Sequence, residues 1–193
     1  MATKPKGMDR RVLRTRQMIV QAFKEILREK GFDAMTVQDI ADHANVNRGT
    51  FYAHFADKYV LIDVVIREEF KRHLTNQLPP EAGWDNRSLH LLISTVLEFF
   101  GQCYPSDVVG SLVKRAAHEE LSKILTEWLN KAKRDQKEWQ VPQQTIVQVI
   151  TWVISGATEY WTRDSTNAKR PPEQIASEIL LVMTEGLKGM VSN

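Results

Sequence analysis

The stretch TVQDIADHANVNRGTFYAHFADKYVL, residues 36–61, has the spacing of two short helices joined by a tight turn. Thr36 can cap the first helix, and Asp39, three residues later, completes a pattern close to a capping box. Asn45 falls at the turn, where a left-handed backbone is easiest for glycine and next easiest for asparagine. The stretch therefore predicts a short first helix that is followed by a tight turn at Asn45.

The second helix is predicted from Arg48 to about Phe55, with Asn47 as its N-cap. Phe51 and Phe55 lie one helical turn apart and form its buried side. The remaining polar side chains then point outward: Arg48, Thr50, Tyr52 and His54. Two helices at this spacing indicate a helix-turn-helix, whose second helix enters the major groove of DNA.

This pattern resembles the N-terminal domain of the tetracycline-repressor (TetR-like) family of bacterial transcription regulators. The resemblance covers roughly residues 12–62 and is carried by Gly31, Thr36, Ile40-Ala41, Asn45-Val46, the run from Thr50 to Phe55, and Lys58. Two positions depart from the family pattern, because Asn45 replaces a turn glycine and Tyr59 replaces an acidic residue. The resemblance implies an all-α protein with a three-helix DNA-binding domain, residues 1–58, and a helical effector-binding and dimerisation domain, residues 59–193.

Recognition of DNA needs side chains that bind phosphates and others that contact base edges. By match to the family motif, Tyr52, His54, Lys58 and Thr36 are expected to bind phosphate. Arg48 is the best candidate for base recognition, since a guanidinium can bond O6 and N7 of guanine together. Gln38 and Thr50 are secondary candidates, and Gly49 would let the helix approach the groove closely.

The charge distribution favours the same end of the chain. Residues 1–58 hold 11 Lys and Arg against 7 Asp and Glu, although the net charge of all 193 residues is only +2. The single cysteine excludes an internal disulfide and a cysteine-rich zinc site. No apolar run approaches the roughly 20 residues of a membrane span. We therefore expect a cytoplasmic protein without membrane contact.

No chemistry of catalysis is indicated by the sequence. The five histidines have no ligand spacing, so no metal is predicted, and no cofactor motif or Ser-His-Asp arrangement can be assigned. The prediction is that the chain is not an enzyme.

Helical periodicity continues through the rest of the chain, and no strand alternation is visible. Helices are expected at residues 10–30, 57–78, 88–104, from 105 to about 134, 143–163 and 172–191, the fourth with a possible break near 117–118. By the resemblance, the last two pair with a second copy in a four-helix bundle. The expected interface is Trp152, Ile179, Val182, Met183, Gly186, Leu187 and Met190. Alternatively, this apolar stripe only completes the monomer core.

The resemblance also implies a small-molecule pocket in the helical domain. Candidate lining residues are Glu98, Phe99, Cys103, His118, Trp128, Trp152 and Glu159. The two glutamates, in apolar helical runs, either pair with Arg115 or His118 or receive a cationic ligand. The leading hypothesis is a homodimeric repressor that binds a palindromic double-stranded DNA operator and releases it when a small molecule binds. The alternative is a DNA-bound protein controlled by a protein partner.

Overall fold

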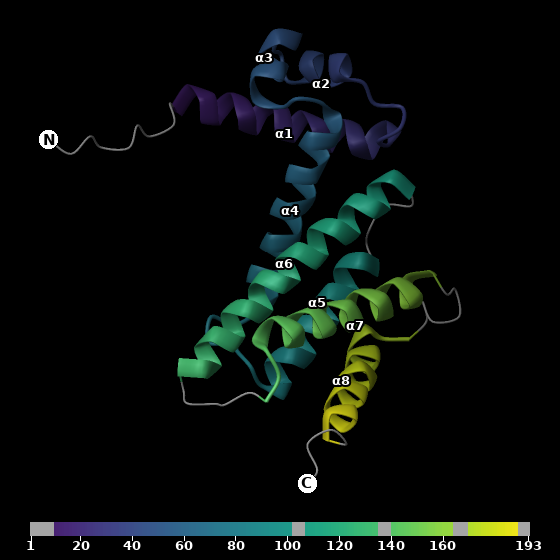
Figure 1. Cartoon of the computed structure of the whole chain (residues 1–193). Helices are drawn as coiled ribbons and strands as arrows, with labels where there is room; N and C mark the ends of the chain where they lie inside the picture. The colour runs from purple at the N-terminus through teal and green to yellow at the C-terminus, as the bar shows by residue number, and fades with distance from the viewer. Residues whose placement is uncertain (1–9, 102–106, 135–139, 164–169, 189–193) are drawn as a thin grey trace, which may run out of the picture. The chain divides into compact units, whose positions relative to one another are not determined.

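The protein is described by a computed structural model that covers residues 10–101, 107–134, 140–163 and 170–188, without the side chains of 107–108, 133–134 and 186–188. Within these ranges the chain forms helices and no strand, which confirms the all-α prediction. The helices, labelled in Figure 1, are α1 (Arg10–Lys30), α2 (Val37–His43), α3 (Arg48–His54), α4 (Lys58–Gln77), α5 (Asn86–Gly101), α6 (Asp107–Arg134), α7 (Gln143–Arg163) and α8 (Pro172–Lys188).

Contacts divide the chain into two compact units, residues 1–65 and 66–193. We call the described part of the first the head, residues 10–65, and the described part of the second the body, residues 66–188. The division falls inside α4, so this one helix begins in the head and ends in the body. The functional boundary that we propose at residues 58 and 59 coincides instead with the start of α4.

The head has its own hydrophobic core. Its α1 is amphipathic and buries Ile19, Phe23 and Ile26, while α3 buries Phe51. The connection after α1 begins at Gly31, whose φ of 75° lies in the left-handed region, where a side chain would be strained. This ends α1 where the sequence predicts it. Helix α2 packs against α1 and α3, and the first turns of α4 bury Leu61 within the head.

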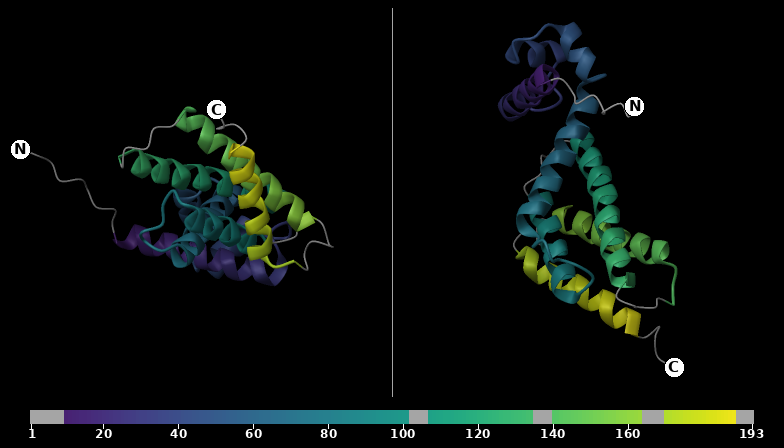
Figure 2. Two further views of the ribbon diagram at one scale, coloured as in Figure 1. Left: turned by 90° about the horizontal axis from the view of Figure 1, so that it is seen from below. Right: turned by 90° about the vertical axis from the view of Figure 1, so that its left-hand side faces the viewer.

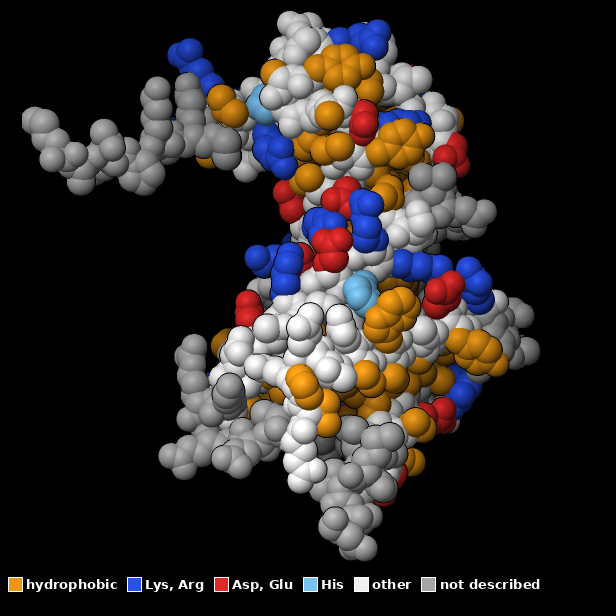
Figure 3. All heavy atoms as spheres, in the orientation of Figure 1, with side chains coloured by type: hydrophobic (Ala, Val, Ile, Leu, Met, Phe, Trp, Pro, Cys, Tyr) orange, Lys and Arg blue, Asp and Glu red, His pale blue; other side chains and the backbone are white. Residues whose placement is uncertain are grey.

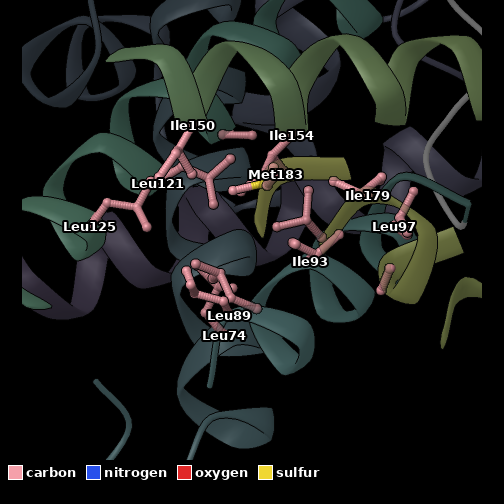
Figure 4. Packing of buried hydrophobic residues seen from close by; sticks show 14 of the residues in the cluster. Leu74, Leu89, Ile93, Leu97, Leu121, Leu125, Ile150, Ile154, Ile179 and Met183 are labelled. Carbon is pink, nitrogen blue, oxygen red and sulfur yellow. The ribbon is translucent and has the colours of Figure 1, made fainter. Parts of the chain in front are cut away.

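The body encloses a larger apolar cluster to which all five of its helices contribute. Figure 4 shows Leu74 of α4, Ile93 of α5, Leu121 of α6, Ile154 of α7 and Met183 of α8 turned toward one another. Helix α8 packs against α5, and α7 packs against α6 and crosses it, as Figure 2 shows. None of the described helices is long and apolar enough to cross a membrane.

One expectation for the body is corrected by the structure. Helix α6 runs unbroken from Asp107 to Arg134, since Ala116 and Ala117, near the expected break, are of the best helix-forming residue type. On α8, Ile179 and Met183 are each only 8% exposed and belong to the body core, and their place in a dimer interface stays a prediction.

Candidate nucleic-acid interface and ligand pocket

The start of α2 is fixed by a capping box. The backbone N–H of Asp39 donates to Thr36 Oγ1 (3.1 Å), and Asp39 Oδ2 accepts from the backbone N–H and the hydroxyl of Thr36 (2.7 and 2.6 Å). Lys30 Nζ lies 2.8 Å from the same Oδ2. The Lys30 ammonium, together with these Thr36 donors, holds the pKa of Asp39 far below its usual range. Thr36 is exposed, but its hydroxyl already donates to Asp39.

The turn and the start of α3 are formed by two asparagines. Asn45 has φ of 52°, the left-handed conformation that the sequence predicts for this position. Asn47 caps α3, since its Oδ1 accepts from the backbone N–H of Thr50 at 2.7 Å. A methyl group at Gly49 would lie 3.1 Å from that Oδ1. A side chain at Gly49 would therefore press on the cap.

The exposed face of α3 carries an ordered pair of polar side chains. Arg48 Nη2 donates to Tyr52 Oη at 3.2 Å, and its guanidinium carbon lies 5.7 Å from the centre of the tyrosine ring. Tyr52 is 47% exposed, whereas Phe51 is fully buried and the Arg16 guanidinium lies over the ring of Phe55 at 4.5 Å. The hydrogen bond thus holds the Arg48 guanidinium beside the Tyr52 ring on the exposed side of α3.

The other candidate DNA-contacting residues lie around this pair. Gln38 is exposed on α2, where its Nε2 donates to Asp42 Oδ1 at 2.7 Å. Thr50 and His54 are half-buried on α3. Together with Arg48, Gly49 and Tyr52 they occupy two consecutive helices of the head, and their contact with DNA stays a prediction.

Lys58, at the first residue of α4, has contacts that sequence reasoning missed. Its ammonium donates to the backbone carbonyls of Phe32 (3.1 Å), Met35 (2.8 Å) and Asp33 (3.5 Å). It also lies 4.7 Å from the centre of the Phe32 ring. These carbonyls belong to the connection between α1 and α2, so Lys58 holds that connection in place. A phosphate contact by Lys58 would require the ammonium to leave them.

The body contains a pocket of about 230 Å³ between α5, α6 and α7, which we call the α5–α6–α7 pocket. One part of its wall is apolar, and another carries charged and polar groups. The lining residues are Val96, Phe100, Lys114, Arg115, Ala117, His118, Leu121, Trp152, Ser155 and Glu159. Three of the seven candidate pocket residues, His118, Trp152 and Glu159, are therefore brought together.

The polar part of this pocket is organised around Glu159. Its Oε1 lies 2.7 Å from Lys114 Nζ and 2.8 Å from Arg163 Nη2. The hydrogen bond from Lys114 is the main reason why the pKa of Glu159 is lowered. His118 lies beside this group, with its Nδ1 3.4 Å from Ser155 Oγ and its ring edge-on to Trp152 at 5.4 Å.

The other candidate pocket residues lie elsewhere. Glu98 approaches His73 of α4, with Oε2 and Nε2 3.9 Å apart, and Phe99 packs edge-on against Phe70 at 4.9 Å. Trp128 is largely buried at the edge of a wider groove of about 520 Å³ between α4 and α6. Cys103 lies outside the described residues. The sequence-based set therefore divides among separate places because the helices turn different faces to different neighbours.

Large apolar side chains are exposed on α7 and α8. Figure 3 shows hydrophobic groups gathered on the surface over α7. Trp152 is 69% and Val182 is 70% exposed, and the exposed members of this apolar face are Val149, Trp152, Val153, Tyr160, Leu181 and Val182. Of the other predicted interface residues, the side chains of Gly186 and Leu187 and all of Met190 lie outside the described residues.

Among the described residues, no group of three or more His, Cys, Asp or Glu side chains could hold a metal ion.

The amino-acid sequence of the head is similar to that of known transcriptional regulators. The sequence model of the family described as "Bacterial regulatory proteins, tetR family" matches residues 19–65. Over 76 residues, 37% of this chain, the sequence is 41% identical to "Uncharacterized HTH-type transcriptional regulator YxbF" of Bacillus subtilis (strain 168), of which the match covers 20%.

The chain spans between a fifth and just under half of the length of the curated relatives that it matches. Solved structures extend the likeness to the body. A TetR-family transcriptional regulator from Pectobacterium atrosepticum has a TM-score of 0.63 at 14% identity, covering 96% of this chain and 98% of that chain. FadR from Bacillus subtilis in complex with stearoyl-CoA has a TM-score of 0.55 at 18% identity, covering 88% and 98%. These likenesses show the fold, and the matched family and relatives regulate transcription and are not enzymes.

Proposed function

Because the chain belongs, through its helix-turn-helix domain, to the TetR family of bacterial transcription regulators, we propose that it is a ligand-responsive repressor. In this proposal a homodimer binds a palindromic operator in the cytoplasm, and a small molecule bound in the body releases it. The observation that carries the proposal is the exposed Arg48–Tyr52 pair on a helix whose opposite face is anchored by Phe51.

The head supports specific DNA binding through two kinds of side chain. Arg48 can turn its guanidinium from the Tyr52 hydroxyl to a guanine edge, while Tyr52 stays beside it to bind phosphate. Gln38 and Thr50 are proposed as further base contacts, and Thr36 and His54 as phosphate contacts. One helix of this length covers few base pairs, so two heads are required for a specific site.

The apolar face of α7 and α8 supports a second copy of the chain as partner. Leu181 and Val182 of α8 are 59% and 70% exposed, whereas Ile179 and Met183 of the same helix are buried. A two-fold contact uses the same patch on both copies, and antiparallel pairing of two such helices from each copy gives a four-helix bundle. We propose that Trp152 and Val182 lie in this interface.

A small-molecule effector is supported by the α5–α6–α7 pocket, which combines an apolar wall with a few convergent polar groups. FadR of Bacillus subtilis, a protein of the same fold, is known in complex with stearoyl-CoA. We propose that this chain also binds a ligand within its body. A protein partner is the alternative occupant, and it would bind an exposed apolar surface instead of a pocket.

Selection of DNA by the purified full-length protein tests the proposal. Rounds of binding to a random duplex pool should enrich a palindrome whose half-sites lie about one helical turn apart, 10–10.5 base pairs. Arg48→Ala should enrich a palindrome in which one base pair of each half-site has lost its preferred identity. Enrichment of single half-sites, or of no sequence at all, would sink the proposal of a dimeric operator-binding regulator.

A further inference from the structure

The charge of the α5–α6–α7 pocket selects among possible ligands. Its charged lining groups are Lys114, Arg115 and Glu159, so two cationic side chains line the pocket with a single carboxylate. The apolar wall is supplied mainly by Phe100, Leu121 and Trp152. The pocket has a volume of about 230 Å³, below the roughly 300–1,000 Å³ of sites for drug-sized ligands, which suits a small compound.

Glu159 is poorly suited to anchor a cationic ligand. Its Oε1 already accepts from Lys114 at 2.7 Å and lies 2.8 Å from Arg163. A ligand cation at the same carboxylate would lie beside the Lys114 ammonium and the Arg163 guanidinium, in a pocket that Arg115 also lines. The cation-binding alternative raised by the sequence is therefore disfavoured by the structure.

Lys114, in contrast, can change partners without leaving a charge unpaired. If a ligand carboxylate accepts from the Lys114 ammonium, Glu159 keeps its ion pair with Arg163. Removing one member of a partly buried pair is costly mainly when the other member is left alone. The double pairing of Glu159 avoids that cost. The pocket thus favours an anion over a cation.

We propose that the α5–α6–α7 pocket binds a small monocarboxylic acid with an apolar body, whose carboxylate pairs with Lys114 and whose body packs against Phe100 and Trp152, an inference that rests on the proposed effector role of this pocket. The acid would enter as its anion at neutral pH, since unperturbed carboxylic acids ionise near pH 4. The Lys114–Glu159 ion pair opens as the new pair forms.

The test compares three probes with one carbon skeleton: trans-cinnamate, its neutral amide and the cationic cinnamylamine. Binding to the full-length protein is measured by calorimetry at pH 7.5. Cinnamate should bind about fivefold more tightly than the amide, since an ion pair at a partly exposed site contributes on the order of 1 kcal/mol. The amine should bind more weakly than the amide.

Variants then assign the preference to Lys114. Lys114→Met should reduce cinnamate affinity about fivefold, to that of the amide, and leave amide affinity unchanged. Lys123→Met is the matched control, because Lys123 lies on the same α6 and pairs with a glutamate, Glu120, but does not line this pocket. Glu159→Gln frees Lys114 from its pair and should tighten cinnamate binding, an effect that mere damage to the fold would not produce.

Equal affinities for acid and amide overturn the inference, as does a loss in Lys114→Met no larger than that in Lys123→Met. Absence of binding by cinnamate, 4-phenylbutyrate and octanoate alike overturns it too. Operator affinity, measured in parallel, separates this inference from the proposed function. Lys114-dependent acid binding that leaves operator affinity unchanged supports the ligand class and refutes the effector role. A neutral compound that binds as well as its acid and releases operator DNA refutes only the ligand class.

Discussion

Replacing Lys58 by methionine separates an internal role of this residue from a DNA-binding one. Methionine keeps an apolar stem beside Phe32 but removes the ammonium that donates to the carbonyls of Phe32 and Met35 at 3.1 and 2.8 Å. Hydrogen bonds to a charged group contribute about 1.5–3 kcal/mol each when buried. Because these are only partly buried, we expect the free energy of unfolding of the head to fall by roughly 2 kcal/mol in total.

Hydrogen exchange is the suitable assay, because all five tryptophans lie beyond residue 65 and fluorescence would report on the body. A loss of about 2 kcal/mol speeds exchange about 30-fold at amides that open with the head, such as those of Ile40 and Ala44. Lys71→Met is the control, since Lys71 is an exposed lysine further along α4 and lies in the body.

DNA binding gives the refuting outcome. With the ammonium held by carbonyls, Lys58→Met should leave the salt dependence of binding to random DNA unchanged at temperatures where the variant is folded. The phosphate contact predicted from the sequence has the opposite signature, a salt slope lower by roughly 0.9 per half-site. A lowered slope together with unchanged hydrogen exchange would refute the internal role and restore the phosphate contact.

Three further changes test other parts of the molecule. Arg48→Ala should cost about 1–3 kcal/mol of binding free energy per base contact and relax the base preference at one operator position, as measured by binding to single-base operator variants. An equal loss of affinity for every variant would instead indicate that Arg48 contacts the DNA phosphates. Val182→Glu, at an exposed position, should give a folded monomer in light scattering. Because Lys30 lowers the pKa of Asp39, the carboxylate stabilises the head above about pH 4 and loses this effect as the pH falls. Asp39→Asn should therefore lower the unfolding temperature at neutral pH, and the difference from the unaltered protein should shrink toward about pH 3.

Much of the head could be predicted because its signals are local. The capping box at Thr36, the left-handed Asn45 and the cap at Asn47 each depend on residues within about one helical turn. Lys58 shows the limit of such signals. Its carbonyl partners precede it by 23 to 26 positions, and a lysine gives no sign in the sequence of which distant backbone it meets.

The helices of the body could be predicted from the sequence, but which of their side chains are buried and which are exposed could be predicted less well. The bounds of α7, Gln143–Arg163, agree with the spacing of its apolar residues. Periodicity marks an apolar face without saying what covers it, so Met183 in the core and Val182 on the surface were assigned to one interface. The pocket was harder still, because Lys114 and Glu159 meet across 45 positions and only the packing of α6 on α7 joins them.

Trp152 connects the two proposals for the body. It lines the α5–α6–α7 pocket beside His118, and it is also 69% exposed among the apolar side chains proposed as the dimer face. A second copy that covers this face changes the surroundings of the same ring that a ligand contacts. Ligand binding and dimerisation must then affect each other by the same factor, because the coupling free energy belongs to the pair of sites. A compound that binds monomer and dimer equally, however tightly, does not shift the equilibrium between monomer and dimer. Such a compound cannot release the operator by changing dimerisation.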